Sequence, residues 1–482
     1  MLLSAKFSLL ALLAASAVSA SLVRVVPGDE GFVPLMHRGM VRRADQTEAQ
    51  FAKVSDANQE CAHPGAQGLN AMVKQHTFPK LSQVASIQDN DSEAQKVWQD
   101  IQSSNIIPSS VQVKKDSTNG QHYGVDDSSY DPKSDPDCWW TATGCKQPKH
   151  DNIPKDIYTC PEPSTWGLTF DDGPNCSHNA FYDYLQQNKL KASMFYIGTN
   201  VVQWPLQAQR GLVDGHDLCV HTWSHRYMTT LSNEQVFAEL YYTAKSIKVT
   251  TGVTPTCWRP PFGDTDDRVR AIAAGLGLRT ILWQQDTDDW NIMPDGNQAT
   301  DAIDNNYQKI FSKNGTQSPI VLTHEIDQYT MGEFQKMYGK LKNAYQNVVP
   351  VSACQNITQP YPENGITYPN FEQFTSGTRA SGLPDGNTIK ADTGATYNVV
   401  PLSKMQNGFA HENQAAASSS SSSSSSGGKH ASSSSSGSKA SSSNAASDSN
   451  NKASSGAAGL FAPSTCMTFV LATGAFFVAA LL

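Results

Sequence analysis

The sequence predicts an α/β fold, a distorted (β/α) barrel of about seven parallel strands, between residues 155 and 355. Apolar runs of strand character alternate there with helical patterns, and a short polar cluster follows most of the runs. Strict alternation of strands and helices indicates parallel strands joined by helical crossovers. An open, doubly wound sheet is the alternative. In both architectures the functional residues belong at the carboxyl ends of the strands.

The strand-like runs lie at 164–170, 191–198, 217–222, 256–259, 279–284, 319–323 and 348–352. Helical patterns separate them, at 177–190, 232–249, 267–274, 299–312 and 331–345. Ser232 and Gln235 form a capping box where the second of these helices begins. The region is too short for a full eightfold barrel, which is why the barrel is expected to be distorted.

The N-terminal segment has the pattern of a secretory signal. Lys6 precedes an apolar run, and small residues end at Ala20, so cleavage is expected after residues 1–20. The run is shorter than a bilayer span needs, which disfavours a transmembrane anchor. Residues 21–150 are interpreted as an N-terminal extension, irregular and partly wrapped on the core. The pair Arg42-Arg43 is a candidate processing site that would remove a pro-segment ending at residue 43.

The C-terminal part is interpreted as an extension (356–413), a flexible Ser-rich stalk (414–456) and a GPI-anchor signal (457–482) that is removed on maturation. A single membrane span is the alternative for the last segment. Small residues are the candidates for lipid attachment: Ser454, Ser455 and Gly456. These features predict a secreted protein that a GPI lipid holds on the plasma membrane, at the cell wall.

The cysteines fit an oxidising compartment. The chain has 9 cysteines and no C-x-x-C spacing, which favours disulfides over metal sites. A Cys160–Cys354 bridge would clamp the ends of the core, and Cys138 with Cys145 would form a local pair. The sequence does not indicate partners for the remaining extracellular cysteines: Cys61, Cys176, Cys219 and Cys257.

Surface chemistry gives weaker signals of the same kind. Four N-x-Ser/Thr sequons are candidate glycosylation sites: Asn90, Asn175, Asn314 and Asn356. Asn175 is the least favoured because it lies beside an aspartate pair. The formal net charge of -8 argues against nucleic-acid binding.

Two adjacent carboxylates stand at the end of the first strand-like run. Asp171 and Asp172 repel each other unless a cation lies near them or one of them keeps a proton. A tight turn closed by Gly173-Pro174 is the alternative interpretation. Neighbouring strand residues point to opposite faces, so both carboxylates reach one site only where the strand turns, and Gly173-Pro174 would supply that turn.

A histidine pair follows the third strand-like run. His221 and His225 can converge on one metal ion if the backbone turns after the strand, although such spacing also arises by chance. With a carboxylate from another strand end, the set becomes two histidines and one aspartate. Three such ligands leave a zinc-type ion open to water.

Three further clusters also follow strands, at 258–263, 286–290 and 322–324. Their alternative interpretations are a rigid turn, a solvated acidic loop or calcium site, and a buried core histidine. In a functional interpretation Arg259 pairs with a carboxylate at the site. Each cluster alone is a modest signal, but five of them at successive strand ends are a strong joint one.

The five clusters resemble the motifs of the NodB-type polysaccharide deacetylases, carbohydrate esterase family four. They read "TFDDGP", "HTWSH", "RPPFG", "DTDDW" and "LTH". The secreted, Ser-stalked layout resembles in particular that of the fungal GPI-anchored chitin deacetylases. The resemblance covers roughly residues 155 to 355.

The resemblance implies that Asp172, His221 and His225 bind a divalent metal, zinc or cobalt. It implies that Asp171 is the general base, that Arg259 orients it, and that the metal charge lets both aspartates stay ionised. His324 would be the general acid and Asp286 the carboxylate that orients it. The remaining implied contacts are the Phe262 backbone N–H with the oxyanion, where the family more often has Tyr, and Leu322 and Trp290 with the acetyl methyl group. Trp290 could instead belong to the core.

The implied reaction is hydrolysis of the N-acetyl groups of chitin or chitooligosaccharides to chitosan and acetate, by a monomer. A glycoside hydrolase would need carboxylates about 5 Å or more apart on either side of the bond, which adjacent aspartates do not offer. Two more functions compete: an esterase for O-acetyl xylan or another polysaccharide, and a wall mannoprotein that only binds glycan. A binding protein would lack a base, a ligand or an acid, and this sequence lacks none of them.

Overall fold

The computed structural model describes residues 46–62, 67–292 and 300–397, Val399, and the strand residues 405–406 and 409–410. The expected signal peptide, Arg42-Arg43, the stalk and the anchor signal with its attachment residues lie outside the described residues. Within that described part, no helix is both long enough and apolar enough to cross a membrane.

The core is an eight-stranded sheet in which every strand pair is parallel. One path runs, in order, through β7 (Arg279–Thr280), β6 (Cys257–Trp258), β5 (Asp217–Val220), β4 (Ser193–Tyr196), β3 (Thr165–Gly173), β9 (Ile320–Leu322) and β8 (Gln285–Asp286). The eighth strand, β10 (Asn347–Val349), pairs with the start of β3. From β3 the strands follow in sequence order to β7 on one side, and β9 and then β8 lie on the other side of β3. Among the described strands, the barrel is open only between β7 and β8, which do not pair. The predicted distorted (β/α) barrel is therefore confirmed.

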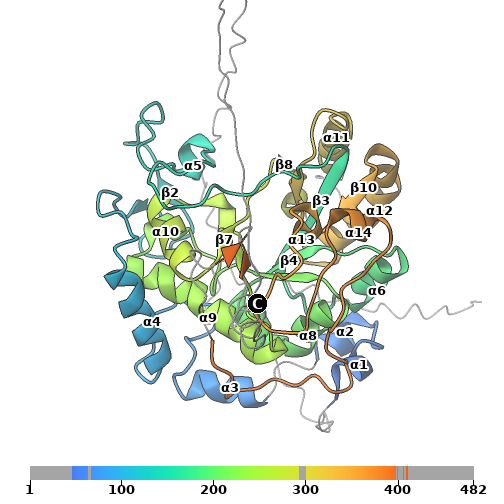
Figure 1. Cartoon of the computed structure of the whole chain (residues 1–482), viewed down its shortest axis with the longest axis horizontal. Coiled ribbons are helices and arrows are strands. Elements are labelled where there is room, and N and C mark those ends of the chain that lie inside the picture. Colours follow the sequence, from blue (N-terminus) through green and yellow to red (C-terminus); the bar gives the residue numbers. More distant parts are fainter. Residues whose placement is uncertain are drawn as a thin grey trace, which may run out of the picture. The chain divides into compact units, whose positions relative to one another are not determined.

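Helices cover the sheet where the sequence predicted them. They are α6 (Asn179–Gln187), α9 (Asn233–Thr251), α10 (Asp267–Gly275), α11 (Thr300–Phe311) and α12 (Gln328–Ala344). In Figure 1, α9 and α10 lie to the left of the sheet, and α6 and α12 to the right. Two further helices, α7 (Gly198–Gln203) and α8 (Pro205–Val213), fill the connection between β4 and β5.

The predicted strand 279–284 is only partly a strand in the structure, because β7 ends at Thr280 and β8 begins at Gln285. Ile281 and Leu282 pair with Ile157, which precedes β3, whereas the N–H of Gln284 donates to the carbonyl of Ile320 in β9. The chain therefore changes partner within this run. It leads from β7, at one end of the open barrel, to β8 at the other end. The last predicted strand also ends early, because helix α13 (Val351–Cys354) begins at Val351.

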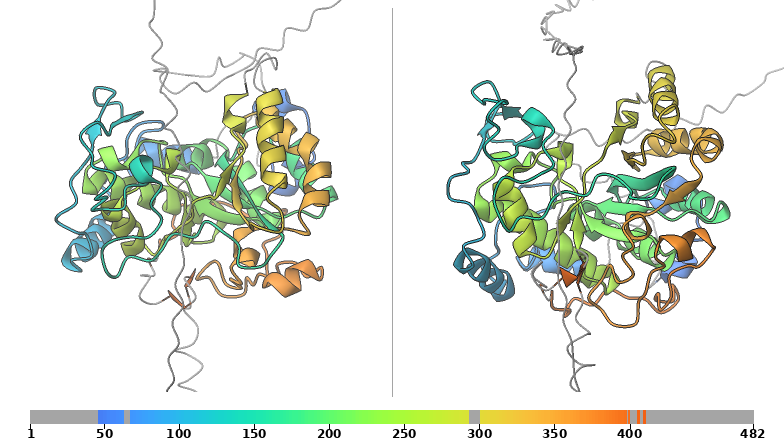
Figure 2. Two further views of the ribbon diagram at one scale, coloured as in Figure 1. Left: turned by 90° about the horizontal axis from the view of Figure 1, so that it is seen from above. Right: turned by 45° about the horizontal axis from the view of Figure 1, so that its top comes forward.

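The N-terminal extension is largely irregular, as predicted, and packs on the core. Its elements are α1 (Glu48–Phe51), α2 (Ala57–Glu60), α3 (Gln67–Lys74), α4 (Ser92–Ser103), β1 (Lys115–Asp116), β2 (Val125–Asp126) and α5 (Trp140–Thr143). Helix α4 lies beside α9 at the edge of the unit (Figure 2), with the rings of Trp98 and Phe237 5.1 Å apart. The buried ion pair Asp91–Lys245, 2.7 Å, fixes the start of α4 on the same helix.

After the barrel, the chain forms α14 (Phe371–Thr375) and the strand pair β11 (Met405–Gln406) and β12 (Phe409–Ala410). Aromatic rings fill the core beside β3. Phe170 meets Phe181 and Phe334 edge to face, each with ring centroids 5.0 Å apart. This packing fixes the strand that ends in the aspartate pair.

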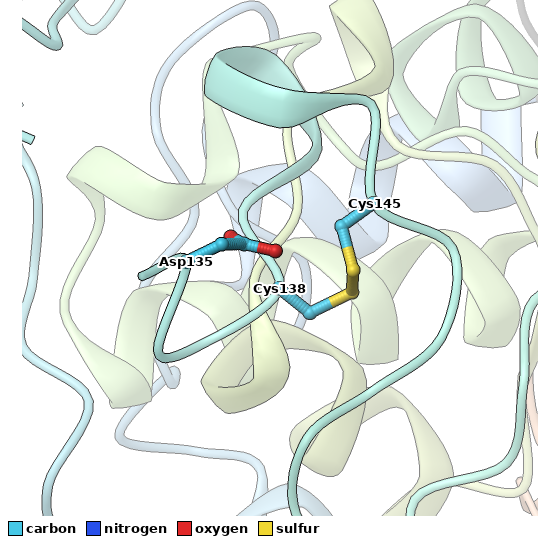
Figure 3. A group of neighbouring side chains, drawn as sticks. All are labelled: Asp135, Cys138 and Cys145. Atoms are coloured by element: carbon cyan, nitrogen blue, oxygen red, sulfur yellow. A yellow bond between two sulfur atoms is a disulfide. The ribbon is translucent and has the colours of Figure 1, made fainter. Parts of the chain in front are cut away.

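Disulfides join all eight cysteines of the described region: Cys61–Cys176, Cys138–Cys145, Cys160–Cys354 and Cys219–Cys257. The second and third are the pairs expected from the sequence. Asp135 lies beside the Cys138–Cys145 bond (Figure 3). Because the two sulfurs bond to each other, neither is a thiolate that could bind a metal there.

Replacing Cys219 and Cys257 together with alanine is expected to lower the free energy of unfolding by about 4 kcal/mol, because this bond closes a loop with a sequence separation of 38. The matched control is the double alanine variant of Cys138 and Cys145, whose separation of 7 predicts a loss of about 2 kcal/mol. Guanidinium unfolding curves measure both values. Equal losses in the two variants would contradict the loop-closure explanation.

Candidate metal centre and active site

The end of β3 turns at Asp172 itself. The pairing of β3 with β4 shifts register between Asp171 and Gly173, and Asp172 has φ 71°, in the left-handed region. Such a bulge re-aims a side chain, so both carboxylates reach the same imidazole: Asp171 Oδ2 and Asp172 Oδ1 lie 3.8 and 3.3 Å from His221 Nε2. The turn was expected one residue later, at Gly173-Pro174. Gly173 has a different role, because a Cβ there would lie 1.6 Å from Glu325 Oε1.

Asp172, His221 and His225 form the predicted ligand cluster, with ligand atoms all within 4.8 Å of one another. Asp172 Oδ1 lies 3.3 Å from His221 Nε2 and 3.1 Å from His225 Nε2. The same oxygen is buried and has no hydrogen-bond partner among the described residues. His221 Nδ1 lies 2.8 Å from the carbonyl oxygen of Arg259. A carbonyl only accepts, so Nδ1 carries the proton and Nε2 is free to bind a metal.

The charge state of Asp172 suits a metal ligand. Burial alone would raise its pKa, but the imidazoles of His225 and His221 hold the pKa of this carboxyl well below its ordinary value. With a metal bound, the two imidazoles would be neutral, and two such nitrogens with one carboxylate oxygen make a donor set typical of catalytic zinc and related divalent ions. The residues present therefore fit the metal that the sequence implied.

Arg259 holds Asp171, as the sequence predicted. Its Nη1 donates to Asp171 Oδ1 at 2.6 Å and to Thr169 Oγ1 at 2.9 Å. The guanidinium is fully buried and lies 4.1 Å over the ring of Phe195. One oxygen of Asp171 is thus fixed, and the second faces the ligand cluster.

His324 is held by Asp289 and not by Asp286, so the prediction for the orienting carboxylate is wrong. His324 Nδ1 lies 2.6 Å from Asp289 Oδ1, and the backbone N–H of His324 donates to Oδ2 at 2.9 Å. Asp288 has φ 55° and begins the 3-10 turn η3 (Asp289–Asn291), which turns Asp289 back under the histidine. Asp286 Oδ1 instead accepts the backbone N–H of Asp288. Burial raises the pKa of Asp286 to about 6.

The pairing with Asp289 sets the charge of His324. Burial disfavours the cation, but Asp289, followed by Asp172 and Asp171, raises the pKa of His324 to about 10. The imidazole is therefore protonated at neutral pH, and the backbone of His324 pairs with that of Asp171. Three aspartates in four residues gave the sequence no means of choosing among them.

Of the residues expected to contact substrate, Phe262 and Trp290 lie on the loops after β6 and β8, and Leu322 is the last residue of β9. Phe262 stands in the first turn of the 3-10 helix η2 (Pro261–Gly263), where backbone N–H groups have no partner within the helix. Its ring is 39% exposed and stacks on Tyr227, with centroids 4.3 Å apart. Trp290 is 51% exposed, which rules out the core-packing interpretation, whereas Leu322 is buried.

The loops of this site contain strained backbone. Several non-glycine residues of the motif loops adopt positive φ: Asp172, Thr222, His225, Phe262 and Asp288. Each such residue costs about 1–3 kcal/mol and persists only where its surroundings impose it. Strain of this kind is typical of catalytic and binding loops.

A family model for polysaccharide deacetylase matches residues 159–281. Chitin deacetylase 2 of Cryptococcus neoformans var. grubii is 50% identical over 344 residues, which cover 70% of this chain and 74% of that protein. The chain belongs to the polysaccharide deacetylase family. The resemblance seen in the five motifs is thereby confirmed, and the chain is a deacetylase.

Two further family members are similar. The chitin deacetylase of Amylomyces rouxii is 47% identical over 317 residues, or 64% of this chain and 73% of that protein. The solved chitin deacetylase of Colletotrichum lindemuthianum is 27% identical, with a TM-score of 0.38, and the match covers 42% of this chain and 91% of that one.

Proposed function

We propose that this deacetylase hydrolyses the N-acetyl groups of chitin and chitooligosaccharides, giving chitosan and acetate, with zinc or cobalt held by Asp172, His221 and His225. One observation carries the proposal: the ligand cluster adjoins Asp171, a carboxylate that Arg259 fixes, and Asp171 pairs along the backbone with His324, whose imidazole Asp289 holds. The chitin deacetylases among its relatives support chitin as the substrate.

Asp171 and His324 suit the two proton transfers of amide hydrolysis. A divalent cation bound here would polarise water and lower its pKa toward about 7. Asp171 accepts a proton from the attacking water, because its free oxygen faces the ligand cluster. His324 donates a proton to the amide nitrogen, which otherwise leaves poorly. The N–H of Phe262 stabilises the oxyanion, and Leu322 and Trp290 contact the acetyl methyl group.

The geometry weighs against two competing functions. Asp171 and Asp172 approach the same imidazole, so they cannot flank a glycosidic bond as the carboxylates of a glycoside hydrolase do. A protein that only binds glycan has no need of a buried arginine on one carboxylate and a buried aspartate on one imidazole. An esterase for O-acetyl xylan would use the same groups, so substrate comparison has to separate it from a chitin deacetylase.

We infer a secreted protein that a GPI lipid holds at the cell surface as a monomer. The disulfides support an oxidising, extracellular compartment. Asn90, Asn314 and Asn356 are exposed and suit glycosylation. Asn175 suits it less, because it is only partly exposed and lies close to the aspartate pair.

The test of substrate class is acetate release from a chitin tetramer and from an acetylated xylan oligomer, each with and without a chelator. We expect faster release from the chitin tetramer than from the xylan oligomer, because the chitin deacetylases among the relatives support chitin as the substrate. Chelation is expected to abolish release. Faster release from xylan would identify an esterase, and release from neither would favour a glycan-binding protein.

A further inference from the structure

The loop that carries both ligand histidines is strained. We call His221–Arg226 the metal loop. Within it, Thr222 has φ 64° and His225 has φ 56°. The hydroxyl oxygen of Thr222 accepts the backbone N–H of His225, which closes the turn at 3.2 Å. One internal hydrogen bond does not offset the cost of two residues in the left-handed conformation. Contacts from outside the loop therefore have to stabilise this conformation.

Glu239 of α9 supplies part of that packing. Its side chain is 0% exposed, and both carboxylate oxygens face the metal loop. Oε2 accepts the backbone N–H of Ser224 at 2.8 Å, and Oε1 accepts the Ser224 hydroxyl at 2.7 Å. The acceptor Oε1 also takes the backbone N–H of Ala85, at 2.8 Å. One buried carboxylate thus joins the metal loop to the N-terminal extension.

The same part of the extension makes three more contacts with the metal loop. The carbonyl of Lys80 accepts the indole N–H of Trp223 at 3.0 Å, and the carbonyl of Ser82 accepts from Arg226 at 2.9 Å. The ring of Phe78 packs on that of Trp223, with centroids 5.6 Å apart. Trp223 stands between the two ligand histidines in the sequence, so these contacts act on the backbone that positions both.

We propose that Glu239 is a positioning residue for the metal, and that residues 78–85 of the extension help to hold the metal loop in place. Glu239 and this segment together hold the metal loop in the strained shape in which His221 and His225 face Asp172. The inference rests on the proposed metal site and assigns a role to a segment that lies outside the matched family region, residues 159–281. It predicts that metal affinity depends on a carboxylate that does not touch the metal.

The test is the affinity of the metal-free, full-length chain for Co²⁺, measured by calorimetry, with Glu239→Gln as the variant. An amide offers one acceptor oxygen, and its NH₂ group would face a backbone N–H, so at least one of the three bonds is lost. We expect the Kd for Co²⁺ to rise by roughly 10–100-fold, as for other residues that support metal ligands. A Kd within about 2-fold of wild type would overturn the proposal.

Tyr242→Phe is the matched control. The hydroxyl of Tyr242, also on α9, accepts the backbone N–H of Gln88 at 2.9 Å, so this change loosens the extension just after residues 78–85 and leaves the bonds of Glu239 in place. We expect its Kd for Co²⁺ to stay within about 2-fold of wild type. A rise equal to that of Glu239→Gln would overturn the role of Glu239, because general loosening of the extension would then explain both.

A second variant covers failure of Glu239→Gln to fold. Ser224→Ala removes only the hydroxyl bond to Glu239, and we expect a rise in Kd of roughly 3-fold or more at an unchanged thermal midpoint; an unchanged Kd would overturn the proposal. A wild-type chain that binds no Co²⁺ would overturn the metal site itself. Wild-type binding with an unaffected Glu239→Gln would overturn only the positioning role, so the two failures are distinguishable.

Discussion

Asp171→Asn is expected to lower kcat for acetate release from a chitin tetramer by about 10³-fold, because an amide cannot take the proton of the attacking water. Arg259 still finds an acceptor in the amide oxygen, so the fold of the site is kept. Affinity for Co²⁺ should stay close to that of wild type, since Asp171 is not one of the three clustered ligands. Initial rates at saturating substrate, with calorimetry for the metal, measure both.

Asp172→Asn is the control for that experiment. It changes the adjacent residue, but it removes a ligand, so the loss of activity should be accompanied by a large loss of metal affinity. A variant at Asp171 that keeps more than about a tenth of the wild-type rate would show that another group is the base. Loss of metal at Asp171 and retention at Asp172 would reverse the two assignments.

Asp289→Asn is expected to lower the neutral-pH rate by about 10²-fold and to move the alkaline limb of the pH profile to lower pH. Asp289 holds the pKa of His324 above its ordinary value, so the acid is protonated at neutral pH and loses its proton only as pH rises through the raised value. Asparagine keeps the bond from the backbone N–H of His324 but removes the charge that favours the imidazolium. The measurement is kcat against pH.

Asp286→Asn provides the comparison, because the family motif points to Asp286 and the structure to Asp289. Asp286 accepts a bond from its own loop, so its replacement should change kcat by less than about 10-fold and leave the alkaline limb in place. If Asp286→Asn moved the alkaline limb of the pH profile and Asp289→Asn did not, the assignment of Asp289 as the partner of His324 would be wrong.

The strand ends could be predicted from the sequence because the pattern that marks a buried parallel strand is strong, and because such strands end at one edge of the sheet. Asp171, His221, Arg259 and His324 each lie at the end of an expected strand or directly after it. Their convergence therefore followed from chain order alone. The pairing of Arg259 with Asp171 was predictable for the same reason, since a buried guanidinium at that edge needs a carboxylate.

The features that sequence could not give depend on single backbone angles. A positive φ at Asp288 decides that Asp289 and not Asp286 reaches His324. A positive φ at Asp172 makes the chain turn there, one residue before Gly173. Neither residue is glycine, so no composition signal marked these angles. Glu239 could not be predicted either, because nothing in the sequence distinguishes it from the other residues in the middle of its helix.

One missed disulfide did have a signal. Cys219 and Cys257 lie in two expected strands, and consecutive strands of a barrel with helical crossovers lie side by side, as β5 and β6 do here. The Cys61–Cys176 bond had none, because the extension carries no strand or repeat that fixes its place on the barrel.

We propose that a single divalent ion at the Asp172, His221 and His225 cluster makes this chain a chitin deacetylase. The most direct measurement is the rate of acetate release from a chitin tetramer as the metal-free chain is titrated with Zn²⁺. We expect no release without metal and a rate that rises in proportion to Zn²⁺ up to one equivalent. Full activity of the metal-free chain, or none after one equivalent has bound, would contradict the claim.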